Sequence, residues 1–424
     1  MNGPNDTNRP PPLRLVFLDG MRALAAWFVV VHHIWIESFP GFPGNAGPWV
    51  VGWMRWGHLA VAVFIVLSGF SLILGPARHG DRAVDGNAEF FRRRTRRILP
   101  PYWVALAISM LVIVAYTGQY SGQFVNLKTA LVYGLLLQDI VSAPSPNGAF
   151  WSIAVEWHIY FAFPLILWTI RRWGQTAMLV LTTGAVVLAY LLGTGVGGLF
   201  EKLLHFTPQF LALFALGVFA GRAMLDRPAP DAASRRRTGL LTAVVTGAMV
   251  LVLALGDPGT LVDQFFWLDI VFGSVAALAC YALATGSLPS VARVLGSRPL
   301  VFVGMFSYST YLIHFPVLSV VKHAVAEPLG ATQLERFLIL GGVALPAIAV
   351  CSYLFFLAFE RPFLGRGVKR RAARPSRQDA PTPAQPLTPA QPPMPALPLT
   401  PDADRAPDAA HQGPDRDRGV TPRG

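Results

Sequence analysis

The chain has 424 residues and a net charge of +12, and 53% of its residues are hydrophobic while only 14% are charged. Soluble domains carry about a quarter charged residues, so this composition excludes an ordinary soluble protein. The basic residues gather in a few loops and the C-terminal tail, where membrane topology and anionic lipid headgroups account for them, and we expect no nucleic-acid partner.

Ten apolar segments, each about long enough to cross a hydrocarbon core of roughly 30 Å, follow one another along the chain. They are Leu15–Ser38, Trp56–Gly75, Ile98–Tyr116, Phe150–Ile170, Gln175–Gly193, Phe206–Leu225, Thr238–Gly256, Val262–Ala284, Pro299–Val321 and Phe337–Phe359. This pattern predicts an all-α integral membrane protein with about ten transmembrane helices, a multi-pass protein of the cell membrane in contact with its lipids. The two cysteines, Cys280 and Cys351, fall inside these segments, so we expect no disulfide framework and no metal site.

The two ends of the chain differ in composition from the apolar part. Residues 1–12 are polar and Pro-rich, and the apolar segment after them carries charged residues, unlike a cleavable signal peptide. Residues 366–424 are first basic and then rich in Pro and Ala, so they cannot bury enough apolar area to fold. We therefore expect disordered ends at 1–12 and 366–424 around one transmembrane domain at 13–365.

An eleventh apolar stretch, Ala130–Val141, is too short to cross comfortably, and the basic loops decide how to treat it. If it does not cross, the arginine-rich stretches Pro76–Arg97, Arg222–Arg237 and Arg366–Arg377 all lie on one side of the membrane. The positive-inside rule therefore favours ten spans with both termini in the cytoplasm. Ala130–Val141 is then a re-entrant or half-crossing segment, which requires that its backbone is buried in protein or lines a cavity.

The first apolar segment carries four ionisable residues, Asp19, Arg22, His32 and His33, which are costly inside a bilayer. Arg22 and His33 are eleven residues apart, which on a helix leaves them roughly 20° apart around the axis and about 16 Å apart along it. Asp19 lies one turn before Arg22 and can pair with it. Snorkelling and helix packing are the alternatives, but two charged groups on one face favour a polar channel, whereas His32 points elsewhere and is expected to be structural.

Five arginines precede the third segment, and most of them are expected to be topology signals. Arg94 and Arg97 are three residues apart where the helix meets the bilayer, so they can form a fork for phosphate oxygens. Their spacing alone leaves both interpretations open.

The fourth segment places Glu156 about two turns inside, with Ser152 and Tyr160 four residues away on either side and therefore on the same face. A carboxylate there can handle a proton or hold a sugar hydroxyl, and pairing with a neighbouring helix is the structural alternative. His314, in the outer half of the ninth segment, is by spacing alone more typical of a structural histidine.

At these residues the sequence resembles the acyltransferase-3 family of membrane O-acyltransferases, across roughly Leu13–Phe363. The matching elements are Arg22 with His33, Phe64–Phe70, Arg94 with Arg97 before Ile-Leu-Pro, Phe150–Glu156, Tyr311–His314 and Phe359–Pro362. Each element is weak alone, but six in the right order are specific. Ala62 stands where the family often has an aspartate, and Ala154 stands where a serine is usual, which affects the expected shape of the acceptor pocket.

The resemblance implies an acyl-CoA donor, which is a substrate rather than a permanently bound cofactor, and an acceptor hydroxyl, usually on a carbohydrate. It implies that Arg94 and Arg97 hold the CoA phosphates and that Arg22 guides the thioester inward. His33 then acts as general base or acyl carrier, and Glu156 orients or deprotonates the acceptor or the histidine. We assign Ser152, Tyr160 and His314 to acceptor binding; polysaccharides, glycolipids and sugar-bearing natural products such as macrolides all remain possible acceptors.

Two other functional classes compete with this interpretation. Intramembrane arginine, histidine and glutamate also mark the substrate and proton sites of secondary transporters, although the two halves of this chain show no internal repeat. A receptor or scaffold would use the polar residues only for helix packing, and it leaves the shared face of Arg22 and His33 unexplained.

Overall fold

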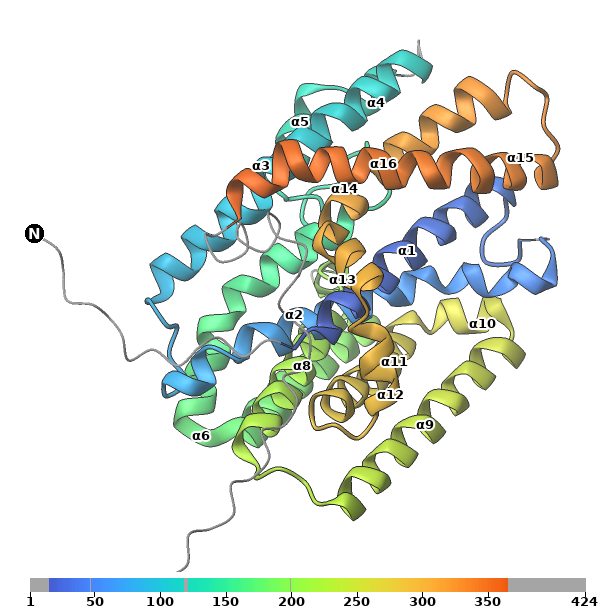
Figure 1. Ribbon diagram of the computed structural model, residues 1–424. Coiled ribbons are helices and arrows are strands. Elements are labelled where there is room, and N and C mark those ends of the chain that lie inside the picture. Colours follow the sequence, from blue (N-terminus) through green and yellow to red (C-terminus); the bar gives the residue numbers. More distant parts are fainter. Residues whose placement is uncertain (1–14, 46, 118–120, 199, 365–424) are drawn as a thin grey trace, which may run out of the picture. The chain divides into compact units, whose positions relative to one another are not determined.

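The computed structural model describes residues 15–45, 47–117, 121–198 and 200–364, and within these ranges it contains helices and no strand (Figure 1). The long helices are α1 (Phe17–Ser38), α2 (Leu59–Ile73), α3 (Asn87–Thr117), α6 (Trp151–Gly195), α8 (Gln209–Asp226), α9 (Ala232–Leu255), α11 (Phe265–Ala284), α14 (Ser307–Val321) and α16 (Leu345–Phe355). The shorter ones are η1 (Trp49–His58), η2 (Pro76–His79), α4 (Ser121–Phe124), α5 (Leu127–Gly134), α7 (Lys202–His205), α10 (Pro258–Asp263), α12 (Pro289–Leu295), α13 (Arg298–Met305), η4 (Lys322–Ala326), α15 (Gln333–Ile339), η5 (Leu340–Ala344), η6 (Phe356–Glu360) and η7 (Arg361–Phe363). The disordered ends predicted at 1–12 and 366–424 lie outside the described residues.

Within the described ranges, eight helical segments are long and apolar enough to cross a membrane, and a ninth is added if α13 and α14 form one span bent by 68°. The sequence predicts about ten because it separates Phe150–Ile170 from Gln175–Gly193. In the structure both segments fall within α6, whose 45 residues are two helices joined at a kink at Gly174, with φ 86° and ψ 169°. The kink lies between the two predicted segments, so the count of eight or nine takes as one segment what the sequence separates into two.

The short apolar stretch does not form a span, in agreement with its prediction. Its helix α5 has eight residues, about 12 Å, and ends before Leu136, whose φ is 57°. Side chains of α3 bind carbonyls in its last turn: Tyr102 donates to Tyr133 O at 2.9 Å, and Trp103 Nε1 donates to Gly134 O at 2.8 Å. The backbone of this segment is therefore anchored in protein, as a non-spanning segment at membrane depth requires.

Small residues bring the central helices close together. A Cβ atom on Gly217 of α8 would lie 2.1 Å from the Val66 carbonyl oxygen of α2, so only glycine fits there. A Cβ atom on Gly304 of α13 would lie 2.0 Å from the Asp19 carbonyl oxygen of α1. Such contacts are typical of helix packing in membranes, and the second fixes the turn of α1 that carries Asp19 and Arg22.

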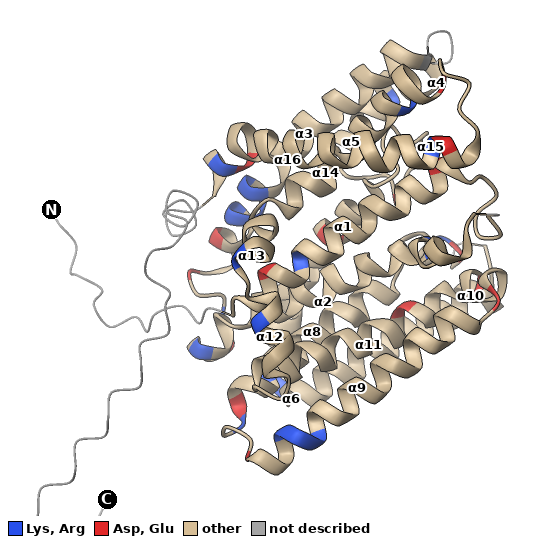
Figure 2. Cartoon of the chain, turned by 45° about the vertical axis from the view of Figure 1, so that its right-hand side comes forward, with Lys and Arg blue, Asp and Glu red and all other residues tan. Residues whose placement is uncertain are grey.

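Charged residues are distributed unevenly over the described helices. Lys and Arg gather mostly on the side of α12 and α13, whereas α10, on the opposite side, carries acidic residues (Figure 2). The first turns of α3 contribute to the basic side because this helix begins at Asn87, eleven residues before the span predicted from Ile98. The arginines of residues 92–97 are thus helical, and α3 extends beyond its apolar part. Which side faces the cytoplasm stays a prediction.

Candidate functional site

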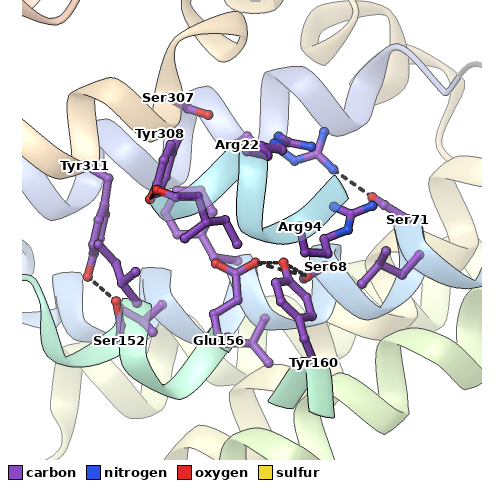
Figure 3. A pocket seen from close by; sticks show the side chains of 17 residues that line it. Arg22, Ser68, Ser71, Arg94, Ser152, Glu156, Tyr160, Ser307, Tyr308 and Tyr311 are labelled. Carbon is purple, nitrogen blue, oxygen red and sulfur yellow. Dashed lines mark hydrogen bonds between the residues drawn. The ribbon is translucent and has the colours of Figure 1, made fainter. Parts of the chain in front are cut away.

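A cavity lies between α1, α2, α3, α6 and the start of α14, and it contains about 1010 Å³ of space, part of it open to solvent (Figure 3). Six of the eight predicted site residues line it: Arg22, Arg94, Arg97, Ser152, Glu156 and Tyr160. They come from three helices, α1, α3 and α6. The structure therefore brings together the predicted donor-binding arginines and the predicted acceptor-binding residues of α6.

Helix α1 supplies Arg22. Its Nη1 donates to the Asp19 carboxylate at 3.2 Å, which is the one-turn pair expected from the spacing, and its Nη2 donates to Ser71 Oγ at 2.7 Å. Asp19 and Ser71 thus hold the guanidinium from two helices, with the arginine still lining the cavity (Figure 3). The positive charge of Arg22 is therefore held facing the cavity.

The arginines of α3 divide into two sets. Arg92 donates to Glu89 at 2.6 Å and 2.8 Å, and Arg93 binds Asp85, so these two are paired outside the cavity. Arg94 lies in the cavity with its guanidinium carbon 5.7 Å from the ring centre of Tyr160. Its Nε is buried and has no hydrogen-bond partner among the described residues. The exposed Arg97 lines the same cavity three residues later.

The loop before α3 is fixed by a buried aspartate. Asp81 pairs with Arg222 of α8, and its backbone carbonyl accepts a hydrogen bond of 3.2 Å from Arg171 Nη1. Burial raises the pKa of the Asp81 carboxyl, and the charge of Arg222 opposes that rise. Arg171 and Arg222 therefore have a structural role, because they hold the chain where it enters α3.

Helix α6 supplies a carboxylate with two hydroxyl partners. Tyr160 donates to the Glu156 carboxylate from one turn away, and Ser68 of α2 donates to the same oxygen at 3.2 Å. The Ser68 and Tyr160 oxygens are themselves 3.2 Å apart. The three side chains point toward one another at the cavity wall (Figure 3). Ser68 was not singled out from the sequence, although it lies within the matched segment Phe64–Phe70.

Helix α14 closes the cavity with Tyr311, a second residue that we did not single out. Its hydroxyl donates to the Ala149 carbonyl at 2.9 Å and lies 2.5 Å from Ser152 Oγ. Because that hydroxyl has only one proton, Ser152 donates to it. Tyr311 thereby ties α14 to the first turn of α6, and its ring centre lies 5.8 Å from that of His314.

The two remaining predicted residues, His33 and His314, do not line this cavity. They contact each other: His314 Nε2 lies 3.3 Å from His33 Nδ1, and their ring centres are 4.9 Å apart. The hydrogen bonds of Glu156 go to Ser68 and Tyr160, and not to the histidine, which was one of its two predicted partners beside the acceptor. His32 binds the Met54 carbonyl at 3.0 Å, as expected for a structural histidine.

Known proteins resemble the chain over most of its length. The sequence matches the Acyltransferase domain of the acyltransferase-3 family over residues 15–361. The exopolysaccharide production protein ExoZ of Rhizobium meliloti is 28% identical over 324 residues, which cover 74% of this chain and 92% of ExoZ. A putative O-acetyltransferase of Staphylococcus aureus strain COL is 25% identical, over 85% of this chain and 59% of that protein.

The O-acetyltransferase OatA of Staphylococcus aureus is 24% identical over 87% of this chain and 60% of its own length. The chain therefore spans about three fifths of these staphylococcal relatives. No solved structure matches it significantly. The match over residues 15–361, together with the relatives, shows that the chain belongs to the acyltransferase-3 family and is an acyl-transferring enzyme.

Proposed function

We propose that the protein transfers an acetyl or other short acyl group from acyl-CoA to a hydroxyl group of a carbohydrate. The observation that carries this proposal is the convergence of Arg22, Arg94, Arg97 and Glu156 on one cavity inside an apolar helix bundle. Three cations and a carboxylate are costly at such a place, so they are retained for a ligand that needs them. An anionic thioester donor next to a neutral hydroxyl acceptor meets that requirement.

The three arginines of the cavity suit an acyl-CoA donor. Arginine presents a planar set of N–H donors that matches phosphate oxygens, and an acyl-CoA is rich in phosphates. Arg97 is exposed and Arg94 Nε is buried without a partner, so together they offer donors from the surface inward. Arg22 lines the cavity on α1 and is held by Asp19 and Ser71. We assign Arg94 and Arg97 to the CoA phosphates and Arg22 to the thioester end.

His33 is the base in this proposal. The acceptor hydroxyl loses its proton to the imidazole, and its oxygen attacks the thioester carbonyl carbon. The C–S bond then breaks, and the CoA sulfur takes the proton from the imidazolium. Glu156, Ser152 and Tyr160 offer one carboxylate and two hydroxyls for the acceptor sugar. The similarity to ExoZ, an exopolysaccharide production protein, supports a carbohydrate acceptor.

A direct test distinguishes acyl transfer from the competing function, transport of the acyl-CoA across the membrane. Wild-type protein in liposomes is supplied with external acetyl-CoA that is labelled either on the acetyl group or on the adenine. The proposal predicts that acetyl label leaves CoA, to water or to an added carbohydrate extract, while adenine label stays outside. Accumulation of adenine label inside, without loss of acetyl label from CoA, would establish transport and overturn the proposal.

The acceptor is identified in cells. A strain that lacks this protein is compared with its parent by mass spectrometry of surface glycans, glycolipids and glycosylated small molecules. We expect one glycan class to lose the mass of an acyl group, most simply an acetyl, and to regain it on complementation. If no carbohydrate changes while a different hydroxyl compound loses an acyl group, the carbohydrate part of the proposal is wrong.

A further inference from the structure

The contact between the two buried histidines points to a role for His314 that differs from acceptor binding. We propose that His314 is a positioning residue for His33: its Nε2 lone pair accepts a hydrogen bond from His33 Nδ1–H and stabilises the imidazolium form of His33 during acyl transfer. This inference rests on the proposed function, in which His33 is the base. It makes His314 part of the chemistry although no atom of His314 lines the cavity.

The proton positions follow from the acceptors around each ring. His314 Nδ1 lies 2.8 Å from the Tyr311 carbonyl oxygen and 3.1 Å from that of Thr310. A carbonyl oxygen can only accept, so Nδ1 of His314 carries its proton and Nε2 of the neutral ring is a lone pair. That lone pair is 3.3 Å from His33 Nδ1. His314 therefore has one nitrogen fixed by its own helix and the other directed at His33.

The same reasoning fixes His33. Its Nδ1 also lies 2.9 Å from the Val29 carbonyl oxygen, so Nδ1 carries the proton and faces two acceptors, Val29 O and His314 Nε2. Nε2 of the neutral ring is then the basic nitrogen, and no described residue hydrogen-bonds it. Val29 alone would specify this tautomer. What His314 adds is a second acceptor on the same N–H group.

A second acceptor matters most when His33 becomes charged. Uptake of the acceptor's proton at Nε2 makes the ring an imidazolium, and hydrogen bonds to an ionised donor are about twice as strong as neutral ones. The third group of a catalytic triad supports its histidine in the same way, with a carboxylate in place of the imidazole. His314 is completely buried, so water does not compete for this bond.

The other titratable groups near His33 have partners other than its ring. His32 lies beside it on α1, with ring centres 5.3 Å apart, and its Nδ1 donates to the Met54 carbonyl oxygen rather than to His33. Glu37 lies one turn further along α1 and is paired with Lys322 at 2.7 Å. Phe315 packs edge-on against the His33 ring at 5.6 Å. His314 is thus the titratable group that hydrogen-bonds the His33 ring among the described residues.

Two substitutions of His314 test the roles of its two ring nitrogens separately. The amide of His314→Gln reaches as far as Nε2 and retains an acceptor for His33, whereas the amide of His314→Asn reaches only as far as Nδ1. With purified full-length protein and labelled acetyl-CoA, we expect His314→Asn to lower kcat about 10- to 30-fold with an unchanged KM for acetyl-CoA. The acid limb of its kcat profile moves about one pH unit lower, because the imidazolium is less stable. His314→Gln stays within about threefold of wild type.

Wild-type behaviour of His314→Asn, in both kcat and pH profile, would overturn the inference. Equal losses in His314→Asn and His314→Gln, with no shift of the acid limb, would reduce His314 to a packing role and also overturn it. If neither variant folds, ¹⁵N NMR of histidine-labelled wild type decides: the His33 signals, identified by their loss in His33→Gln, must show a protonated Nδ1 and a bare Nε2. Full activity of His33→Gln would instead overturn the assignment of His33 as the base, on which this inference rests.

Discussion

Two groups of polar side chains lie among the apolar helices, one around Glu156 and one around Asp269. Asp269 of α11 is completely buried, and its carboxylate lies 3.3 Å from His58 Nε2 and 3.3 Å from Gln209 Nε2. The His58 ring is stacked between Trp151 and Phe265, with ring centres 5.3 Å and 4.4 Å away. Glu156 instead faces a cavity that also exposes three arginines.

The comparison shows that burial of a charge does not by itself identify a catalytic site. His58 and Gln209 lie at the first turns of α2 and α8, where helix dipoles favour a negative charge, so Asp269 joins the ends of several helices. The surrounding helices enclose the Asp269 carboxylate completely. Around Glu156 the protein leaves space, and Arg22, Arg94 and Arg97 line it. An open cavity lined by charged side chains indicates a ligand, whereas an enclosed group indicates a structural connection.

The largest expected effect comes from exchanging each carboxylate for its isosteric amide. Glu156→Gln removes the charge at the cavity, so the rate of acyl transfer should fall at least about 10²-fold, with little change in thermal stability. Asp269→Asn is the matched control: it should retain wild-type activity per folded molecule. Both are measured with labelled acetyl-CoA and by thermal unfolding of the purified protein. Loss of activity in Asp269→Asn at wild-type stability would break the distinction between the two groups.

The next effect separates the arginines of α3. Arg97→Gln should raise the KM for acetyl-CoA about tenfold, since a charge-assisted hydrogen bond to a phosphate contributes about 1.5 kcal/mol or more. Arg92→Gln is the control, because Arg92 is paired with Glu89 outside the cavity. Steady-state kinetics over a range of acetyl-CoA concentrations measures both variants. Equal KM increases would mean that the effect reflects only the net charge of this end of the protein.

Truncation of Asp269 tests the structural side of the comparison. Asp269→Ala leaves the half-buried His58 and the buried Gln209 without their partner, and an unsatisfied buried polar group costs about 1–3 kcal/mol. The purified variant should therefore unfold at a clearly lower temperature than wild type, while the folded fraction remains active. An unchanged unfolding temperature would show that the Asp269 group does not hold the helix ends together.

The smallest effect concerns the hydroxyl that supports Glu156. Ser68→Ala removes one hydrogen bond of 3.2 Å to the carboxylate, and a bond of this kind contributes about 1 kcal/mol, so kcat should fall about fivefold. Ser71→Ala removes a hydroxyl that binds Arg22 instead, and should act mainly on the KM for the donor. The same change in both variants would argue that the two serines only affect packing.

Most charged residues of the cavity could be predicted because charged side chains inside a bilayer carry a high free-energy cost. Arg22 and Glu156 are visible in the sequence as charges in apolar segments, whereas Arg94 and Arg97 stand before one and are singled out by the family motif; the motifs contain all four residues. Ser68 and Tyr311 could not be found this way, since hydroxyls are common in membrane helices and become significant only through their tertiary partners. Asp269 was missed although it is a charge in an apolar segment, because it belongs to no matched motif.

The fold shows a similar limit. Hydropathy locates the apolar segments, but it does not show how far a helix extends beyond its apolar part. The first part of α6 continues through Arg171 and Arg172 to its kink at Gly174. α3 begins eleven residues before Ile98 and includes the arginines there, since arginine is a good helix former. The contact between His33 and His314 joins positions 281 residues apart, which one sequence does not reveal.

The most direct test of the account is acetyl transfer by wild type and His33→Gln, purified and compared at equal folded fraction with acetyl-labelled CoA. We predict that wild type releases free CoA and transfers or hydrolyses the acetyl group, while His33→Gln does so at least about 10²-fold more slowly and still binds acetyl-CoA through its arginines. Equal rates of acetyl loss from CoA in the two proteins would contradict the account.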